Sequence, residues 1–153
     1  MEMRDILAYF AIKNDGVERK ILKDLDNKVR VSPSEVNKMK ENLKYPYITI
    51  IDSNYPEMLK HVKEPPIVLF YKGDPKLLNH DSEIIAKESK DGVKMIHAFD
   101  TRFTNTGIEM NCVMACECHD DMDMLVEKMN DAHSILNDLF KLKQSRDSKK
   151  FQR

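Results

Sequence analysis

Two short apolar segments, each entered through a proline turn, constrain the fold more than any other part of this 153-residue chain. Residues 47–51 (YITII) and 67–71 (IVLFY) are rich in β-branched and aromatic residues, which is typical of buried strands. Tyr45-Pro46 precedes the first segment, and Pro65-Pro66 precedes the second. Because two strands alone expose unpaired edges, they need neighbouring strands from elsewhere in the chain.

A series of motifs extends through these two segments and beyond them: Tyr55-Pro56, Leu59, Pro65-Pro66, Leu69-Phe70-Tyr71, Gly73 and Leu77-Leu78. With this series, residues 45–78 resemble the segment that opens the extended Rossmann domain of the DNA-processing DprA/Smf family. The resemblance implies handling of single-stranded DNA and loading of a recombinase during natural transformation. After Leu78 the family continues into a hydrophobic strand and a Gly-Ser-Arg phosphate-binding turn, which this sequence lacks. We therefore expect the resemblance to cover residues 1–78, to leave residues 79–153 unmatched, and to transfer no DNA-binding residue.

The first 44 residues predict a small domain of three helices, which is also what the family has in this place. The first helix spans residues 3–13 and stops at Asn14-Asp15-Gly16, and the second begins near Val17. Ser32-Pro33-Ser34-Glu35 predicts a third start, with a capping serine, a proline in the first turn and a capping-box glutamate. Residues 45–78 follow as a two-strand lead segment.

The second half predicts a linker and a strand–strand–helix module. Residues 79–92 are polar, which indicates a linker or a poorly packed helix. In residues 93–103 and 108–118, apolar side chains alternate with polar ones, and Asn105-Thr106-Gly107 fits a hairpin turn between them. A long helix is expected from about Asp121, packed on the Met/Cys face of this hairpin. The fold class is therefore α+β, with residues 93–153 as the second module, and whether its hairpin joins the lead strands in one sheet stays open.

Composition limits the functions that this chain can have. A charged fraction of 33% and a net charge of −1 give no overall attraction to polyanions. No apolar run is long enough to cross a bilayer, and the first residues do not form a signal peptide, so we expect a cytoplasmic protein without a membrane partner. The four glycines form no Gly-x-Gly pair, so we expect neither nucleotide binding nor ATPase activity.

Three cysteines and a histidine near the end of the second strand raise the question of a metal site. Cys112, Cys116, Cys118 and His119 cannot share one zinc ion on a regular strand, because residues two apart are separated by about 7 Å. We therefore expect the cysteines to be buried hydrophobic residues, with no metal and no cofactor. His97 and Asp100 fall on opposite faces of their strand, and the acidic residues from Asp120 to Asp123 fit the start of a helix. Without a nucleophile or an acid–base pair, the chain is expected to be no enzyme.

The C-terminal segment supplies the candidate nucleic-acid contacts. They are six basic residues that could make salt-sensitive, sequence-independent contacts to phosphates: Lys141, Lys143, Arg146, Lys149, Lys150 and Arg153. Two functions remain open. One is a non-enzymatic DNA-processing or recombination-mediator relative, with single-stranded DNA and a recombinase as partners. The other is a small protein-interaction or dimerisation module without DNA binding.

Overall fold

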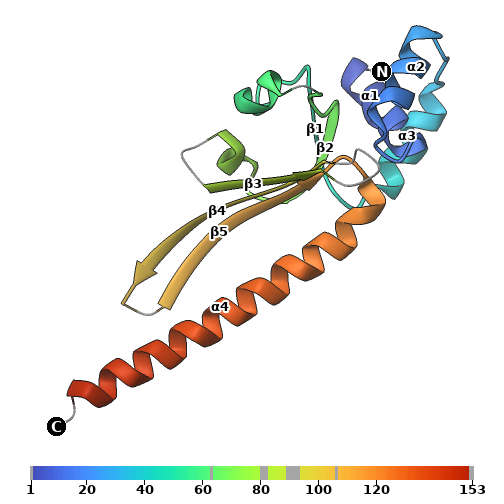
Figure 1. Cartoon of the computed structure of the whole chain (residues 1–153). Coiled ribbons are helices and arrows are strands. Elements are labelled where there is room, and N and C mark those ends of the chain that lie inside the picture. Colours follow the sequence, from blue (N-terminus) through green and yellow to red (C-terminus); the bar gives the residue numbers. More distant parts are fainter. Residues whose placement is uncertain (1, 63, 80–82, 89–93, 106, 152–153) are drawn as a thin grey trace.

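An antiparallel sheet forms the centre of the computed structural model, which describes residues 2–62, 64–79, 83–88, 94–105 and 107–151 (Figure 1). Over these residues the sheet has five strands in the order β1-β2-β5-β4-β3, and each strand pairs antiparallel with its neighbour. The strands are β1 (Tyr47–Thr49), β2 (Val68–Gly73), β3 (Glu83–Glu88), β4 (Lys94–Thr104) and β5 (Gly107–Cys116). Together with the helices, this sheet confirms the predicted α+β class.

The lead strands and the hairpin belong to the same sheet. β4 and β5 form the predicted hairpin, with Phe99 opposite Cys112. β2 then pairs with β5, with Phe70 opposite Cys116. Gly73, at φ +109°, permits this close approach, because a Cβ there would lie 2.1 Å from the carbonyl oxygen of Cys112. The next residue, Asp74, donates its backbone N–H to the same oxygen at 3.0 Å.

The predicted linker contains a strand, which corrects the sequence-based expectation of a linker or poorly packed helix. Residues 83–88 form β3, which pairs with β4 from Glu83 opposite Phe99 to Glu88 opposite Lys94. The error has a physical reason, because β3 is an edge strand and charged residues are common on sheet edges. Residues 80–82 and 89–92 of the predicted linker lie outside the described residues, and a short 3₁₀ helix, η2 (Pro75–Asn79), precedes them.

Three short helices precede the sheet, as predicted: α1 (Met3–Lys13), α2 (Glu18–Asp26) and α3 (Pro33–Asn42). The Ser32 hydroxyl caps α3 by accepting the backbone N–H of Glu35 at 3.2 Å. The turn after α1 contains Gly16 at φ +76°, whose N–H donates to the carbonyl of Ala11 at 2.8 Å. A Cβ on Gly16 would lie 2.5 Å from the backbone oxygen of Glu117, so this turn packs directly against the chain that leaves β5.

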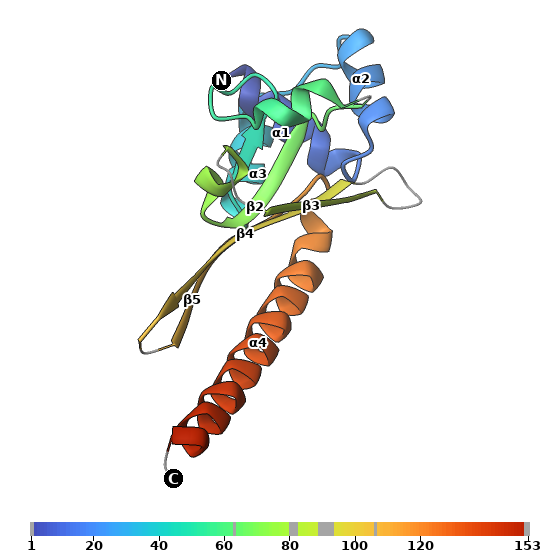
Figure 2. The same ribbon diagram turned by 60° about the vertical axis from the view of Figure 1, so that its left-hand side comes forward.

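The C-terminal helix covers the Met/Cys face of the hairpin. After a short 3₁₀ helix, η3 (His119–Asp121), α4 runs from Met122 to Phe151. Figures 1 and 2 show it passing along β4 and β5, with its start close to α1–α3 and its C-terminal end far from them. Met122, Leu125 and Met129 are buried on its inner face. The predicted start and packing face of this helix are confirmed.

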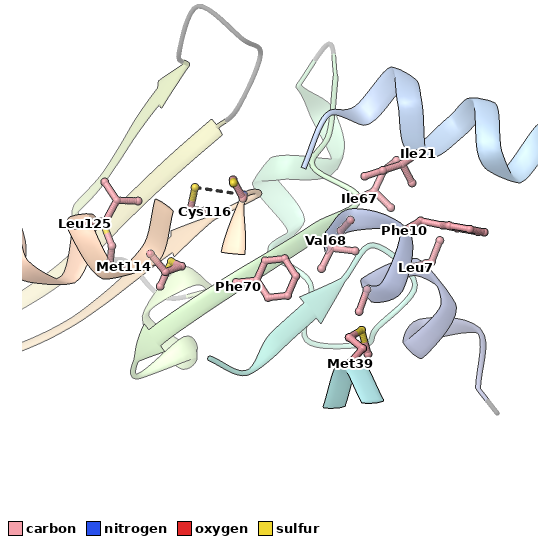
Figure 3. Packing of buried hydrophobic residues seen from close by; sticks show 14 of the residues in the cluster. Leu7, Phe10, Ile21, Met39, Ile67, Val68, Phe70, Met114, Cys116 and Leu125 are labelled. Carbon is pink, nitrogen blue, oxygen red and sulfur yellow. Dashed lines mark hydrogen bonds between the residues drawn. The ribbon is translucent and has the colours of Figure 1, made fainter. Parts of the chain in front are cut away.

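Alternation along the strands gives the sheet a core on each face. On one face, Val68 and Phe70 of β2 and Met114 and Cys116 of β5 pack with residues from all four helices (Figure 3). On the other face, residues of β1, β2, β4 and β5 pack with Tyr55, with Leu59 of η1 (Glu57–His61) and with leucines of η2. Each core draws residues from both sides of residues 79–92.

Candidate functional site

A pocket of about 670 Å³ lies between α1, α3 and the start of α4, and we call it the interhelical groove. It brings together aromatic rings and charged side chains from segments far apart in the sequence. Its lining includes Tyr9, Glu35, Lys38, Lys44, Tyr45 and His119. Because α1 and α3 come from the helical domain while His119 follows β5, the groove exists only in the assembled fold.

One side of the groove carries a polar cluster around Asp123. The hydroxyl of Tyr45 donates to the Asp123 carboxylate, and the Lys44 ammonium lies 3.1 Å from it. These two partners hold the pKa of Asp123 below its usual range. The same hydrogen bond raises the pKa of Tyr45 to about 12, so its hydroxyl keeps its proton at physiological pH.

His119 packs among aromatic rings. Its Nε2 accepts the backbone N–H of Lys44 at 3.3 Å. Its ring packs edge-on against Phe70, at 5.0 Å between centroids, and against Tyr45, at 5.6 Å. The sequence-based expectation is that His119 points to the face of the strand away from the cysteines, and the structure corrects this. His119 belongs to η3 and not to β5, and the Phe70 ring that it contacts lies directly opposite Cys116, on the cysteine face of the sheet.

The charges of the groove are balanced. Three lysines line it, Lys13, Lys38 and Lys44, together with three carboxylates, Glu35, Asp120 and Asp123. Glu35 accepts the Tyr9 hydroxyl at 2.8 Å, and Asp123 is held as described above. The groove can therefore offer aromatic edges and lysine ammonium groups to a ligand, but it has no strong net field for an anion.

Two of the three cysteines are core residues. Cys116 and Cys118 are buried, and the backbone N–H of Cys118 lies 3.4 Å from the Cys116 sulfur (Figure 3). Burial raises the pKa of the Cys116 thiol to about 12 and also raises that of Cys118. Both groups are therefore uncharged thiols at neutral pH.

The third cysteine lies beside two histidines under α4. Cys112 of β5, His97 of β4 and His133 of α4 place one ligand atom each within 4.8 Å of the others. The Cys112 thiol also lies 3.4 Å from the Met129 sulfur. Among the described residues, no hydrogen-bond partner reaches the buried Nε2 atoms of His97 and His133. A buried polar atom without a partner costs about 1–3 kcal/mol, so these two nitrogens destabilise the helix–sheet interface unless a ligand satisfies them.

The surroundings of this cluster favour the uncharged forms of Cys112 and His97. Burial raises the pKa of Cys112. Burial lowers the pKa of His97, and the nearby His133 lowers it further. A thiolate–imidazolium pair, which a cysteine nucleophile would need, is therefore disfavoured here.

Sequence reasoning missed this cluster because its members lie in three separate elements. Each of the three elements did carry a sequence signal, because a side chain able to bind a metal interrupts its apolar stripe. These side chains are His97 in β4, Cys112 in β5 and His133 in α4. Only the packing of α4 on the hairpin brings the three together. His97 and Asp100 do not form a pair, since His97 is half-buried and Asp100 is exposed.

The candidate nucleic-acid contacts fall in the last turns of α4 and beyond its end. α4 continues to Phe151, so Lys141, Lys143, Arg146, Lys149 and Lys150 belong to this helix, but their side chains lie outside the described part of the chain. Arg153 lies outside the described residues altogether. Among the described helices, none has both the length and the apolar character that crossing a membrane requires.

The central segment of the chain has recognisable relatives. Residues 46–115 match the family model described as DNA recombination-mediator protein A. This family segment, residues 46–115, is somewhat less than half of the chain. No curated protein and no solved structure shows significant similarity to the chain.

The family segment coincides with the sheet. It begins at Pro46, just before β1, and ends at Ala115, one residue before the end of β5. The match confirms the resemblance over the lead strands, and it continues beyond Leu78, where the sequence-based expectation ended it. The helices α1–α3 and α4 lie outside the match. This relates the sheet, and not the whole chain, to the DNA recombination mediators.

Within the family segment, the two proline motifs contact one another. The hydroxyl of Tyr55, in the Tyr-Pro motif, donates to the carbonyl oxygen of Pro66, in the Pro-Pro motif, at 2.7 Å. Tyr55 is 1% exposed and packs in the core opposite the helices. The residues that carry the resemblance therefore fix how the chain enters β2.

Proposed function

We propose that this protein is a non-enzymatic DNA-processing factor that binds single-stranded DNA and passes it to a recombinase, as in natural transformation. The observation that carries the proposal is the match of residues 46–115 to the DNA recombination-mediator family. The proposed place of action is the cytoplasm, where incoming single strands meet the recombinase.

Two regions of this chain support DNA binding. The interhelical groove places Tyr9 and Tyr45 beside Lys38 and Lys44. Proteins that bind single strands without sequence preference combine stacking rings with a positively charged groove. The lysines of this groove are balanced by its three carboxylates, so its proposed contribution is mainly the aromatic rings. The basic C-terminal segment, residues 141–153, would add contacts to phosphates that weaken as salt rises.

The test is an electrophoretic shift of a single-stranded oligonucleotide across a salt series. Binding should weaken with salt, with a slope of about −0.7 for each phosphate contact in a plot of log affinity against log salt. Lys38→Ala combined with Lys44→Ala would lower the affinity if the groove carries the DNA. Alanine at Lys143, Arg146, Lys149 and Lys150 would lower it if the C-terminal segment does.

Lys60→Ala is the matched control, because Lys60 is a half-exposed cation on η1, away from both regions. It should bind as the unchanged protein does. Circular dichroism of every variant separates lost contacts from lost folding. No shift at low salt, with the protein folded, would contradict the proposal.

The alternative function is a protein-interaction or dimerisation module. The observation that favours it is the long α4, which extends away from α1–α3 (Figure 2) and exposes Met124 and Ile135 at 51% and 60%. A stable oligomer by mass measurement in solution, without affinity for single-stranded DNA, would support this function over the first.

A further inference from the structure

We propose that His97, Cys112 and His133 bind one thiophilic transition-metal ion, zinc or copper(I), with the Met129 sulfur beside them as a further ligand. The proposal departs from the sequence-based expectation of no metal. That expectation concerned cysteines on one strand, whereas these residues come from β4, β5 and α4.

The donor set determines the kind of ion. Imidazole nitrogen suits zinc and copper, and thiolate and thioether sulfur select copper(I) and zinc over magnesium, calcium or manganese. No carboxylate takes part in this group. Zinc and copper(I) both fit this donor set, as soft or borderline ions held by two nitrogens and one or two sulfurs.

The ligand atoms need to approach one another only slightly to reach the spacing of a metal site. In a tetrahedral zinc site the ligand atoms lie about 3.3–3.8 Å apart, as follows from metal–ligand distances of about 2.0–2.3 Å. The three ligand atoms here all lie within 4.8 Å of one another, and the two sulfurs are 3.4 Å apart. Rotation of the imidazole rings of His97 and His133 can provide the remaining approach.

The surroundings favour a metal over other uses of these groups. The Nε2 atoms of both histidines are buried and, among the described residues, have no hydrogen-bond partner. An ion would satisfy both, and it would stabilise a thiolate that these surroundings otherwise disfavour. Because His133 and Met129 lie one helical turn apart on α4, the ion would also fasten this helix to the hairpin.

The test is metal binding by the full chain, freed of metal with a chelator and free of any histidine tag. Zinc and copper(I) are titrated separately, each against a chromophoric chelator that competes for that ion. We expect one equivalent of at least one of the two ions, and a higher melting temperature in its presence. Cobalt(II), used in place of zinc, should give a thiolate-to-metal charge-transfer band.

Cys112→Ala and His133→Gln should each weaken binding by more than about tenfold, because loss of a direct ligand exceeds the loss caused by outer partners of a metal site. Cys112→Ala should also remove the cobalt charge-transfer band. The matched controls are Cys118→Ala and His61→Gln, since Cys118 is buried outside the cluster and His61 is exposed on η1. Both controls should bind as the unchanged chain does.

The proposal is wrong if neither ion binds stoichiometrically, or if the two ligand variants, folded by circular dichroism, bind as tightly as the controls. Met129→Leu distinguishes the two ions, because a thioether matters more to copper(I). Loss of copper(I) affinity with unchanged zinc affinity would assign the sulfur to a copper site. None of these outcomes depends on DNA binding.

Discussion

At the scale of single residues, a glycine and a small set of charges join the helical domain to the sheet. Gly16 lies against the backbone of Glu117 with a left-handed φ of +76°. Arg4 of α1 pairs with Asp52 at 3.1 Å and lies over the ring of Tyr47, 4.6 Å from its centroid. These contacts are formed between segments that local patterns do not connect.

We expect Gly16→Ala to destabilise the fold by roughly 2–4 kcal/mol, because it adds backbone strain to a clash that the backbone of Glu117 must relieve. Urea unfolding measures this loss. Asp15→Asn is the control, since Asp15 already has a φ of +52°, is exposed, and asparagine tolerates this conformation. If Gly16→Ala lowers the free energy of unfolding by less than about 0.5 kcal/mol, the backbone at Glu117 can move to accommodate the added methyl group.

The charges around Asp52 predict a loss of stability in acid. Burial alone would raise the pKa of Asp52, but the Arg4 guanidinium and the N–H of Thr49 outweigh it, so the pKa lies below its usual value. A carboxylate with a lowered folded pKa stabilises the fold above its unfolded pKa of about 4, and this contribution is lost as the pH falls through the folded pKa.

Asp52→Asn should therefore destabilise the protein by about 1–2 kcal/mol at pH 7, and by less at pH 3, which lies below the unfolded pKa of about 4, so that part of the contribution of the carboxylate is already lost. Urea unfolding at the two pH values measures both differences. Asp26→Asn, at an exposed carboxylate at the end of α2, should show little change at either pH. An equal effect of Asp52→Asn at both pH values would contradict the ion pair as its cause.

At the scale of elements, the path between β1 and β2 depends on one buried hydroxyl. Tyr55 donates to the carbonyl of Pro66 at 2.7 Å, which positions the chain just before β2. Pro56 precedes η1, whose Leu59 is buried in the same core as Tyr55. The proline motifs therefore act through one hydrogen bond and shared packing.

Tyr55→Phe keeps the ring but leaves the buried Pro66 oxygen without its partner, which should lower the free energy of unfolding by about 1–3 kcal/mol. Tyr71→Phe is the matched control, because Tyr71 lies on the next strand and is only half-buried. Thermal unfolding of both variants measures the difference. Equal melting temperatures would show that ring packing alone places β2.

At the scale of the whole molecule, one sheet joins the two halves. β2 pairs with β5 over four residue pairs, from Phe70 opposite Cys116 to Gly73 opposite Val113. Both cores contain residues from before and after the predicted boundary at residues 79–92. The first half therefore lacks strands on one side of β2 when the second half is removed.

We expect that residues 1–80, expressed alone, unfold or aggregate, because β2 would expose an unpaired edge and Phe70 would lose its contacts with β5 and α4. Circular dichroism and gel filtration of this fragment measure the effect, and mixing it with residues 81–153 should restore folding. The uncut chain is the control. Two fragments that each unfold cooperatively with the stability of the whole would show that the halves are independent.

Sequence patterns were sufficient where one element determines its own structure. The cap at Ser32, the turn at Asn14-Asp15-Gly16, the lead strands, the hairpin and the start of α4 each follow from local propensity and alternation. They failed for β3, because the polar residues of an edge strand resemble those of a linker. The cluster at His97, Cys112 and His133 could not be found locally, since its members are separated by 15 and 21 positions.

The sequence by itself determined most of the helices and strands, β3 excepted, which of their faces are apolar, and that the lead strands resemble a DNA-processing family, whose model matches residues 46–115. The tertiary structure alone decided that β2 pairs with β5, that Gly16 contacts Glu117, and that Cys112 lies close to two histidines. The physical reason is that periodicity fixes the face of each element through short-range backbone geometry. Which faces meet is decided only when the complete set of apolar surfaces is buried together.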